Sequence, residues 1–112
     1  MSVFNNISEG AIIARQNHNI TMCNMVARIL FDITEDEIIG WRVTDLLKND
    51  DHLLEAYYET INRKSIIREI MNTSVTINRR KAKEKVAINF RCFSFNSTEN
   101  DCFVLLLFQQ IS

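Results

Sequence analysis

The stretch "ITEDEIIGWR", residues 33–42, has the pattern of a very short helix with both ends marked. Thr34 is a typical N-cap residue, and Glu37 follows three residues later, where its carboxylate can reach back to the amide of the cap. The two acidic residues between them suit the positive end of the helix dipole. Gly40 can take the left-handed conformation that ends a helix. A helix of little more than one turn is unstable alone in water, so it must pack on something larger.

The residues before this helix predict a β-hairpin and a second short helix. Residues 10–15, "GAIIAR", and 20–23, "ITMC", are apolar runs with strand character, and the polar residues "QNHN" between them form a turn. Asn24 then stands at the N-cap position of a helix that extends to about residue 32.

The residues after Gly40 predict two more helices. Thr44 or Asp45 can cap a single turn, and "NDDHLLEAYYETINRK", residues 49–64, is the clearest helix of the chain. Its apolar side chains recur at i, i+3, i+4 and i+7, which predicts one buried stripe. The stripe consists of Leu54, Tyr57, Tyr58 and Ile61.

Beyond residue 70 the apolar residues change to a period of two, which is typical of strands. Two long runs lie between residues 70 and 95, separated by the basic run "RRKAKEK" at 79–85. The last run, "CFVLLLFQQI" at 102–111, is apolar on both faces, so both faces should be covered. In the second of the long runs, the predicted buried face consists of Val86, Ile88, Phe90 and Cys92.

Composition limits the class of protein. The chain has 112 residues, 24% charged and 46% hydrophobic, which fits one globular domain. A net charge of −1 gives no general attraction to nucleic acid or to an anionic membrane. The longest apolar run is too short to span a bilayer, and the amino terminus lacks a secretion signal. Three widely spaced cysteines without a CxxC pair are typical of reduced thiols, so we expect a cytoplasmic protein.

The order of the predicted elements indicates an α+β fold. Two strands come first, then several short helices and one longer helix, and then three strands. Segregation of this kind predicts a five-stranded antiparallel sheet with short helices packed on one face.

The residues "EGAIIARQNHNITMCNMVARILFDITEDEIIGWRVTDLL", 9–47, resemble the amino-terminal half of a PAS domain. The resemblance lies in the Glu-Gly before the first strand, the polar hairpin, the Asn24 cap, the short acidic helix that ends at Gly40 and the "DLL" that follows. Three long carboxy-terminal strands extend it to roughly residues 7–112. Phe31 departs from the family where glycine is common, the loop at 79–85 lacks Asp-Gly, and the closing "QIS" replaces Asp-Ile-Thr.

The resemblance implies a division into a flanking segment, residues 1–9, which can be helical, and a single PAS domain, residues 10–112. It implies a non-catalytic sensory module that binds a small ligand, forms a homodimer, or does both, and so regulates an output domain of the same signalling protein. The alternative is a purely structural homodimerisation or protein-interaction module with a filled core. A weaker alternative is a haem-based gas sensor that uses His52.

Several chemistries are disfavoured by the residues themselves. No nucleophile elbow, phosphate loop or metal-binding histidine spacing is present, so neither catalytic nor metal-binding residues are predicted. The basic run at 79–85 could meet phosphates or an acidic partner, but such a run is more often a solvated turn that discourages edge pairing. No aromatic residues interleave with it, which argues against nucleic-acid binding.

Haem and flavin are disfavoured as cofactors. His52 lies at a spacing similar to that of the proximal histidine in oxygen-sensing PAS domains. However, it is about 160° around the helix from Leu54 and shares its face with Glu55, Ala56 and Glu59. We therefore expect His52 to face solvent. Light-oxygen-voltage PAS domains carry an Asn-Cys-Arg-Phe run on a helix. Here Cys23 precedes Asn24, and Cys23 is interpreted as a small core residue.

Two surfaces are the candidate sites. Side-chain parity predicts that an apolar pocket for a small ligand is lined by Tyr57, Tyr58, Ile61, Ile88 and Phe90. The outer face of strand 102–108, together with Phe93 and Phe95, needs cover from a partner subunit or from the segment "MSVFNNI". We therefore expect a homodimer.

Overall fold

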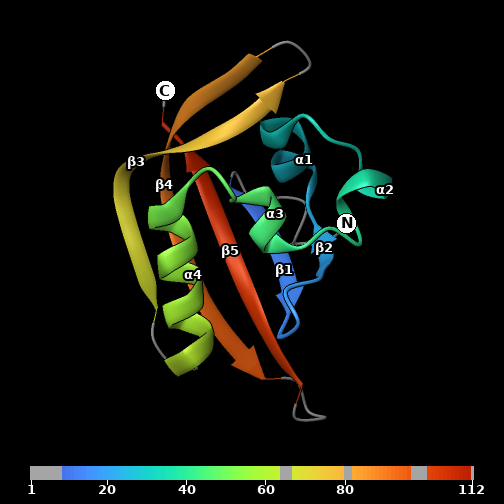
Figure 1. Ribbon diagram of the computed structural model, residues 1–112, viewed down its shortest axis with the longest axis vertical. Coiled ribbons are helices and arrows are strands. Elements are labelled where there is room, and N and C mark those ends of the chain that lie inside the picture. Colours follow the sequence, from blue (N-terminus) through green and yellow to red (C-terminus); the bar gives the residue numbers. More distant parts are fainter. Residues whose placement is uncertain (1–8, 64–66, 80–81, 97–100, 112) are drawn as a thin grey trace.

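The computed structural model describes residues 9–63, 67–79, 82–96 and 101–111, and it is a five-stranded antiparallel sheet with helices on one face (Figure 1). The strand order is β2-β1-β5-β4-β3, so the first and last strands of the chain pair in the middle of the sheet. The strands are β1 (Gly10–Arg15), β2 (Ile20–Cys23), β3 (Arg68–Arg79), β4 (Ala82–Asn96) and β5 (Cys102–Gln110). The predicted fold class is confirmed. The flanking segment predicted at residues 1–9 lies, apart from Glu9, outside the described residues.

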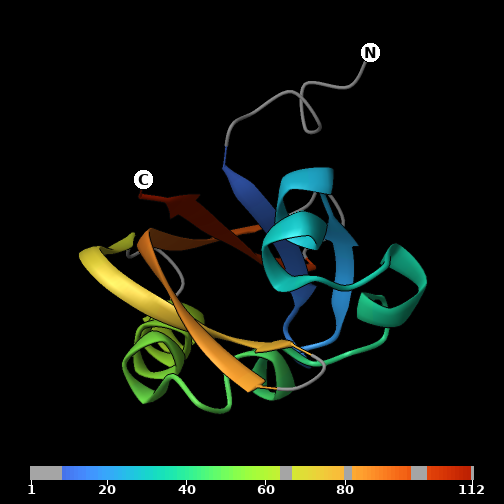
Figure 2. The same ribbon diagram turned by 90° about the horizontal axis from the view of Figure 1, so that it is seen from above.

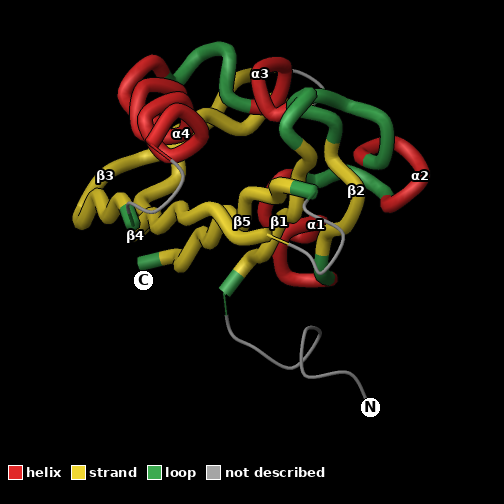
Figure 3. The backbone as a smooth tube through the Cα atoms, turned by 90° about the horizontal axis from the view of Figure 1, so that it is seen from below, coloured by secondary structure: helices red, strands yellow, loops and turns green. Residues whose placement is uncertain are grey.

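Four helices connect β2 to β3. They are α1 (Met25–Phe31), α2 (Glu35–Ile38), α3 (Val43–Leu46) and α4 (Asp51–Arg63). Figure 3 shows α3 and α4 on the same side of the sheet, and in Figure 2 the β3–β4 hairpin curves around α4. The ring of Phe31 on α1 meets Phe108 on β5 edge-on, with centroids 5.1 Å apart, so α1 packs on this inner face too.

Asn24 fixes the start of α1, as predicted, and also attaches it to the sheet. Its Oδ1 accepts hydrogen bonds from the backbone N–H of Ala27 and of Ala11, both at 2.9 Å, and its Nδ2 donates to the Glu9 carbonyl at 2.8 Å. Gly10 permits this close approach, because a Cβ there would lie 3.1 Å from the Cα of Ala27.

The short acidic helix α2 begins and ends where the sequence predicts. Thr34 is its N-cap and accepts a hydrogen bond from the Glu37 amide at 3.2 Å. The Glu37 carboxylate accepts from the Thr34 hydroxyl at 3.1 Å, rather than from the backbone amide that we expected. Gly40 has φ +96 and nothing within 4 Å of an added Cβ, so its conformation rather than space requires glycine.

The start of α3 was predicted wrongly. The N-cap is Arg42, not Thr44 or Asp45, and the Asp45 carboxylate accepts from the Arg42 amide at 3.4 Å. Asp45 therefore fills the third helical position, where an acidic residue satisfies the amide of the cap.

The loop between β3 and β4 is shorter than predicted. β4 begins at Ala82, so the exposed side chains of Lys83 and Lys85 belong to a strand rather than to the turn at 79–85.

The pairing of β3 with β4 shifts between Ile70 and Thr73, which marks a β-bulge. Asn72 has φ +53 at this bulge, and its amide donates to Asn89 Oδ1 at 2.9 Å. Asparagine tolerates this left-handed conformation better than most residues.

Both edges of the sheet are covered at defined positions. On β3, the amide of Thr76 donates to both carboxylate oxygens of Asp50, at 3.0 and 3.1 Å. On β2, the Ile20 amide donates to the Trp41 carbonyl at 2.8 Å, and the Ile20 carbonyl accepts from Gly40 at 3.3 Å. The segment after α2 therefore lies along one edge, and a buried carboxylate occupies part of the other.

Candidate functional site

The interior between α4 and the sheet contains four of the five residues predicted to line a ligand pocket. Tyr57, Ile88 and Phe90 have no accessible surface, and Ile61 is buried as well. Tyr58 does not line the interior, because 42% of it is exposed. Phe90 packs against Phe108 of the neighbouring strand with ring centroids 5.3 Å apart, and both rings belong to the buried core.

The face that α4 buries differs from the predicted stripe. Leu53, Ala56 and Thr60 are buried on it, whereas Leu54 is only half-buried. Thr60 satisfies its hydroxyl by donating to the Ala56 carbonyl at 2.9 Å. Small residues such as Ala56 and Thr60 let the helix lie close to β4, and a search for large apolar residues does not find them.

His52 lies on the exposed side of α4, as predicted. Its Nε2 is 2.7 Å from the Thr73 hydroxyl, and the side chain is exposed. The placement of Ala56 on the same solvent face was wrong, because Ala56 is 2% exposed. Hydrogen bonding to a surface strand directs the imidazole away from the interior.

A polar contact at the edge of the core was missed by the sequence interpretation. His18 lies in the β1–β2 turn with φ +76, and its Nδ1 is 2.9 Å from the hydroxyl of Tyr57. Burial raises the pKa of Tyr57, with smaller contributions from Cys92, Tyr58 and Cys102. The Tyr57 phenol therefore remains protonated and hydrogen-bonded to the turn. Because His18 and Tyr57 are far apart in the sequence, no local pattern predicts this contact.

The buried thiols are protonated core groups. Burial raises the pKa of Cys92 to about 12, although a hydrogen bond with Thr60 opposes this shift. Burial likewise raises the pKa of Cys23, which closes β2 and belongs to the core, as predicted. Neither thiol has the lowered pKa of a reactive cysteine.

The outer face of the sheet carries a continuous apolar row across four strands. In the strand register Met22 is opposite Ile13, Ile13 is opposite Leu105, and Leu105 is opposite Phe93. Met22 is 48% exposed, and the other three are partly exposed. We call these four residues, with the adjoining Phe95 and Phe103, the outer apolar band.

The two phenylalanines extend the band at one end. Phe95 and Phe103 stack with ring centroids 5.5 Å apart and an interplanar angle of 20°. Phe95 is 39% exposed. An exposed apolar surface formed by neighbouring strands is typical of an interaction site.

The other end of the outer face is polar. The Arg91 guanidinium donates to both carboxylate oxygens of Glu9, at 2.6 and 2.7 Å. Nearby, the side-chain Nδ2 of Asn89 donates to Oε1 of Gln109 at 3.3 Å. An apolar centre bordered by paired polar groups has the general composition of a protein–protein interface.

The described part of the chain shows no group of three or more histidine, cysteine or acidic side chains placed to hold a metal ion. Among its helices, none combines the length and the apolar character needed to cross a bilayer.

Comparison with known proteins identifies the fold. No protein-family model matches the chain, and no curated protein matches it. Solved structures do match over nearly the whole chain. The chain is similar to the PAS domain of HTR-like protein from Haloarcula marismortui, with 15% sequence identity and a TM-score of 0.73. The match covers 97% of this chain and 91% of that one.

Two further matches come from bacterial proteins. The PAS domain of nitrogen regulation protein NR(II) from Vibrio parahaemolyticus has 15% identity and a TM-score of 0.72, covering 99% of this chain and 100% of that one. The PAS domain of BvgS from Bordetella pertussis has 11% identity and a TM-score of 0.70, covering 98% and 82%.

These matches define an α+β class of domain whose antiparallel sheet carries its helices on one face. The chain has the PAS fold. Identities this low establish the fold alone, so the function has to be argued from the site.

Proposed function

We propose that the chain is a non-catalytic sensory module of a signalling protein, and that two copies pair through the outer apolar band to regulate an output domain. The observation that carries this proposal is the row from Met22 through Ile13 and Leu105 to Phe93. Pairing would bury side chains that are otherwise partly exposed, and each square ångström of apolar surface removed from water contributes roughly 25 cal/mol. Because the row crosses four neighbouring strands, β2, β1, β5 and β4, a shift of any one of them would alter the pairing surface directly.

The fold supports a role in signalling by analogy. The solved structures with this fold include a PAS domain described as coming from a two-component sensor histidine kinase. By this analogy the chain would pass a conformational change to a domain of the same protein, with each state favouring a different arrangement of the pair.

A substitution at the centre of the band tests the pairing. Leu105→Glu places a charge in the middle of the row, and we expect it to convert a dimer into a folded monomer in sedimentation equilibrium. Ile67→Glu is the matched control, because Ile67 is 62% exposed and lies outside the band. A wild-type chain that is monomeric, or a Leu105→Glu variant that still dimerises, contradicts the proposal. Cover of the band by residues 1–8 is one way in which the wild type would be monomeric.

Ligand sensing is the second candidate function. One observation favours it: the Tyr57 hydroxyl and the His18 imidazole place a polar pair beside a mainly apolar interior. A small apolar ligand with one polar atom would displace core side chains near Ile61, Ile88 and Phe90 and bond to that pair. A native mass spectrum of the freshly purified chain tests this candidate. Bound mass that Tyr57→Phe removes supports ligand sensing, and bound mass that the variant retains contradicts this site.

A further inference from the structure

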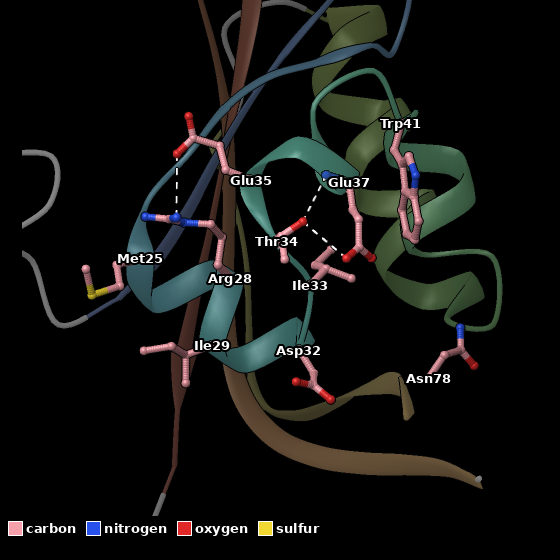
Figure 4. A pocket seen from close by; sticks show the side chains of 10 residues that line it. All are labelled: Met25, Arg28, Ile29, Asp32, Ile33, Thr34, Glu35, Glu37, Trp41 and Asn78. Carbon is pink, nitrogen blue, oxygen red and sulfur yellow. Dashed lines mark hydrogen bonds and ion pairs between the residues drawn. The ribbon is translucent and has the colours of Figure 1, made fainter. Parts of the chain in front are cut away.

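A surface groove of about 730 Å³ lies between α1, α2 and the end of β3 (Figure 4). Its apolar lining includes Met25, Ile29, Ile33 and Trp41. Ile29 is 70% exposed, Met25 is 56% exposed and Trp41 is 41% exposed. Met25 and Ile29 are four residues apart and therefore share one side of α1, while Figure 4 shows Trp41 across the groove from them. Apolar side chains this large are rarely grouped on a surface that serves only as solvent boundary.

The charged lining of the groove is predominantly acidic. Asp32, Glu35 and Glu37 contribute three carboxylates against the one guanidinium of Arg28, a net formal charge of −2. The whole chain has a net charge of only −1, so negative charge is concentrated here. Arg28 Nη1 lies 3.6 Å from Glu35 Oε2, so this ion pair links α1 to α2.

We propose that this groove docks an amphipathic helix of a partner protein, with apolar side chains on one face and Lys or Arg beside them. The exposed Ile29 and Trp41 supply the apolar contact, and the carboxylates attract the basic residues. Two copies of the chain would not pair groove to groove, because like charges would then face each other. A small molecule would remain largely exposed in so open a site, whereas binding pockets usually enclose most of a small ligand.

The groove and the outer apolar band are separate surfaces. The groove is built by α1, which packs on the inner face, and by α2, which lies next to the edge strand β2, whereas the band lies on the strands of the opposite face. Helix docking in the groove is therefore independent of the proposed pairing. A Leu105→Glu monomer should dock the helix as the wild type does. Failure of the pairing proposal would therefore leave the test of helix docking unaffected.

Trp41 gives a direct measurement, because it is the only tryptophan of the chain. The probe is a synthetic helical peptide of about 14 residues, or four turns, with leucine on one face and lysine on the other. We expect a saturable blue shift of the Trp41 fluorescence, with an affinity that falls as salt is added. The control peptide has glutamate in place of lysine, and we expect it to cause no shift.

Matched variants locate the binding site. Ile29→Ser should weaken peptide binding at least about tenfold, because a buried isoleucine contributes on the order of 1.5 kcal/mol or more. Ile67→Ser is its control, since Ile67 is similarly exposed, at 62%, and lies outside the groove. Glu37→Gln should weaken binding about two- to fivefold, the range of one rim charge. Glutamine can keep the cap with Thr34, and Glu55→Gln on α4 is the control for the loss of an exposed carboxylate.

Three results would overturn the inference. The first is a wild-type chain whose Trp41 fluorescence does not respond to the leucine–lysine peptide. The second is an equal response to the leucine–glutamate peptide. The third is undiminished binding by both Ile29→Ser and Met25→Ser, whose folding is checked by circular dichroism and is expected to be intact because both side chains are mostly exposed.

Discussion

The two faces of β5 carry the same kind of side chain into different surroundings. Leu106 points toward the helices and has no accessible surface, whereas its neighbour Leu105 points outward into the outer apolar band and is partly exposed. The alternation of side chains along a strand produces this difference without any change of residue type. Leu106 therefore contributes to the folded core, and Leu105 is the residue that the proposed pairing would bury.

The largest test of this comparison is leucine truncation at adjacent positions. Leu106→Ala should lower the free energy of unfolding by about 2–5 kcal/mol, because it leaves a cavity in a packed core. Leu105→Ala should cost about 1 kcal/mol or less in dilute solution, since its side chain is only half-buried. Urea unfolding measures both. The cost at Leu105 should rise with protein concentration if it contributes to pairing, and equal costs in dilute solution would show that the two faces are equally packed.

The N-cap residues Asn24 and Thr34 allow the same comparison, of a buried with an exposed position, for hydrogen bonds. Asn24→Ala should cost about 2–3 kcal/mol, because it removes a cap and leaves the buried amide of Ala11 and the part-buried carbonyl of Glu9 without their partner. Thr34→Ala, at an exposed cap, should cost about 0.5–1 kcal/mol. The matched measurement is urea unfolding of the two variants, and a larger loss at Thr34 would contradict the buried role of Asn24.

Alkaline pH should destabilise the inner face. Burial raises the pKa of the folded Cys92 thiol to about 12, from 9.0 when unperturbed, so the unfolded chain releases this proton first. Its contribution to stability is complete below pH 9 and is lost as the pH rises toward 12. For Cys92 alone the loss between pH 9 and pH 10 is about 1 kcal/mol. Cys92→Ala should remove that part of the slope in urea unfolding across this interval. An unchanged slope would assign the loss to other groups, such as Cys23.

The smallest effect concerns two adjacent tyrosines of α4. Tyr57→Phe removes the buried hydroxyl that bonds to His18 and should cost about 1 kcal/mol. Tyr58→Phe changes a side chain that is 42% exposed and should stay within about 0.5 kcal/mol of the wild type. Thermal unfolding of the pair provides the measurement, and a reversed order would place the important hydroxyl on the outer side of the helix.

Much of the fold follows from local signals in the sequence. Asn24, Thr34 and Gly40 mark helix ends by their own chemistry, and the period-two pattern from Val86 to Cys92 predicts the buried face of β4. The rest depends on contacts between distant segments. The orientation of α4 follows from the small buried residues Ala56 and Thr60, which a search for large apolar positions does not weigh.

The candidate sites were less predictable than the fold. Parity correctly indicates that Ile88 and Phe90 point inward, but parity cannot distinguish a pocket lining from a filled core. The contact of His18 with Tyr57 joins residues 39 positions apart in the chain. The groove also depends on how the α1–α2 connection sits against the end of β3, which no local pattern specifies.

The hydrogen bonds from Thr76 to Asp50 and from Ile20 to Trp41 limit the way in which this molecule can assemble. An unprotected strand edge accepts further strands without end, and such addition produces fibres. Here an incoming strand would meet a carboxylate on one edge and a chain segment on the other. Growth of the sheet in its own plane is therefore opposed, and contact through the broad face would end after two copies, giving a closed pair instead of a polymer.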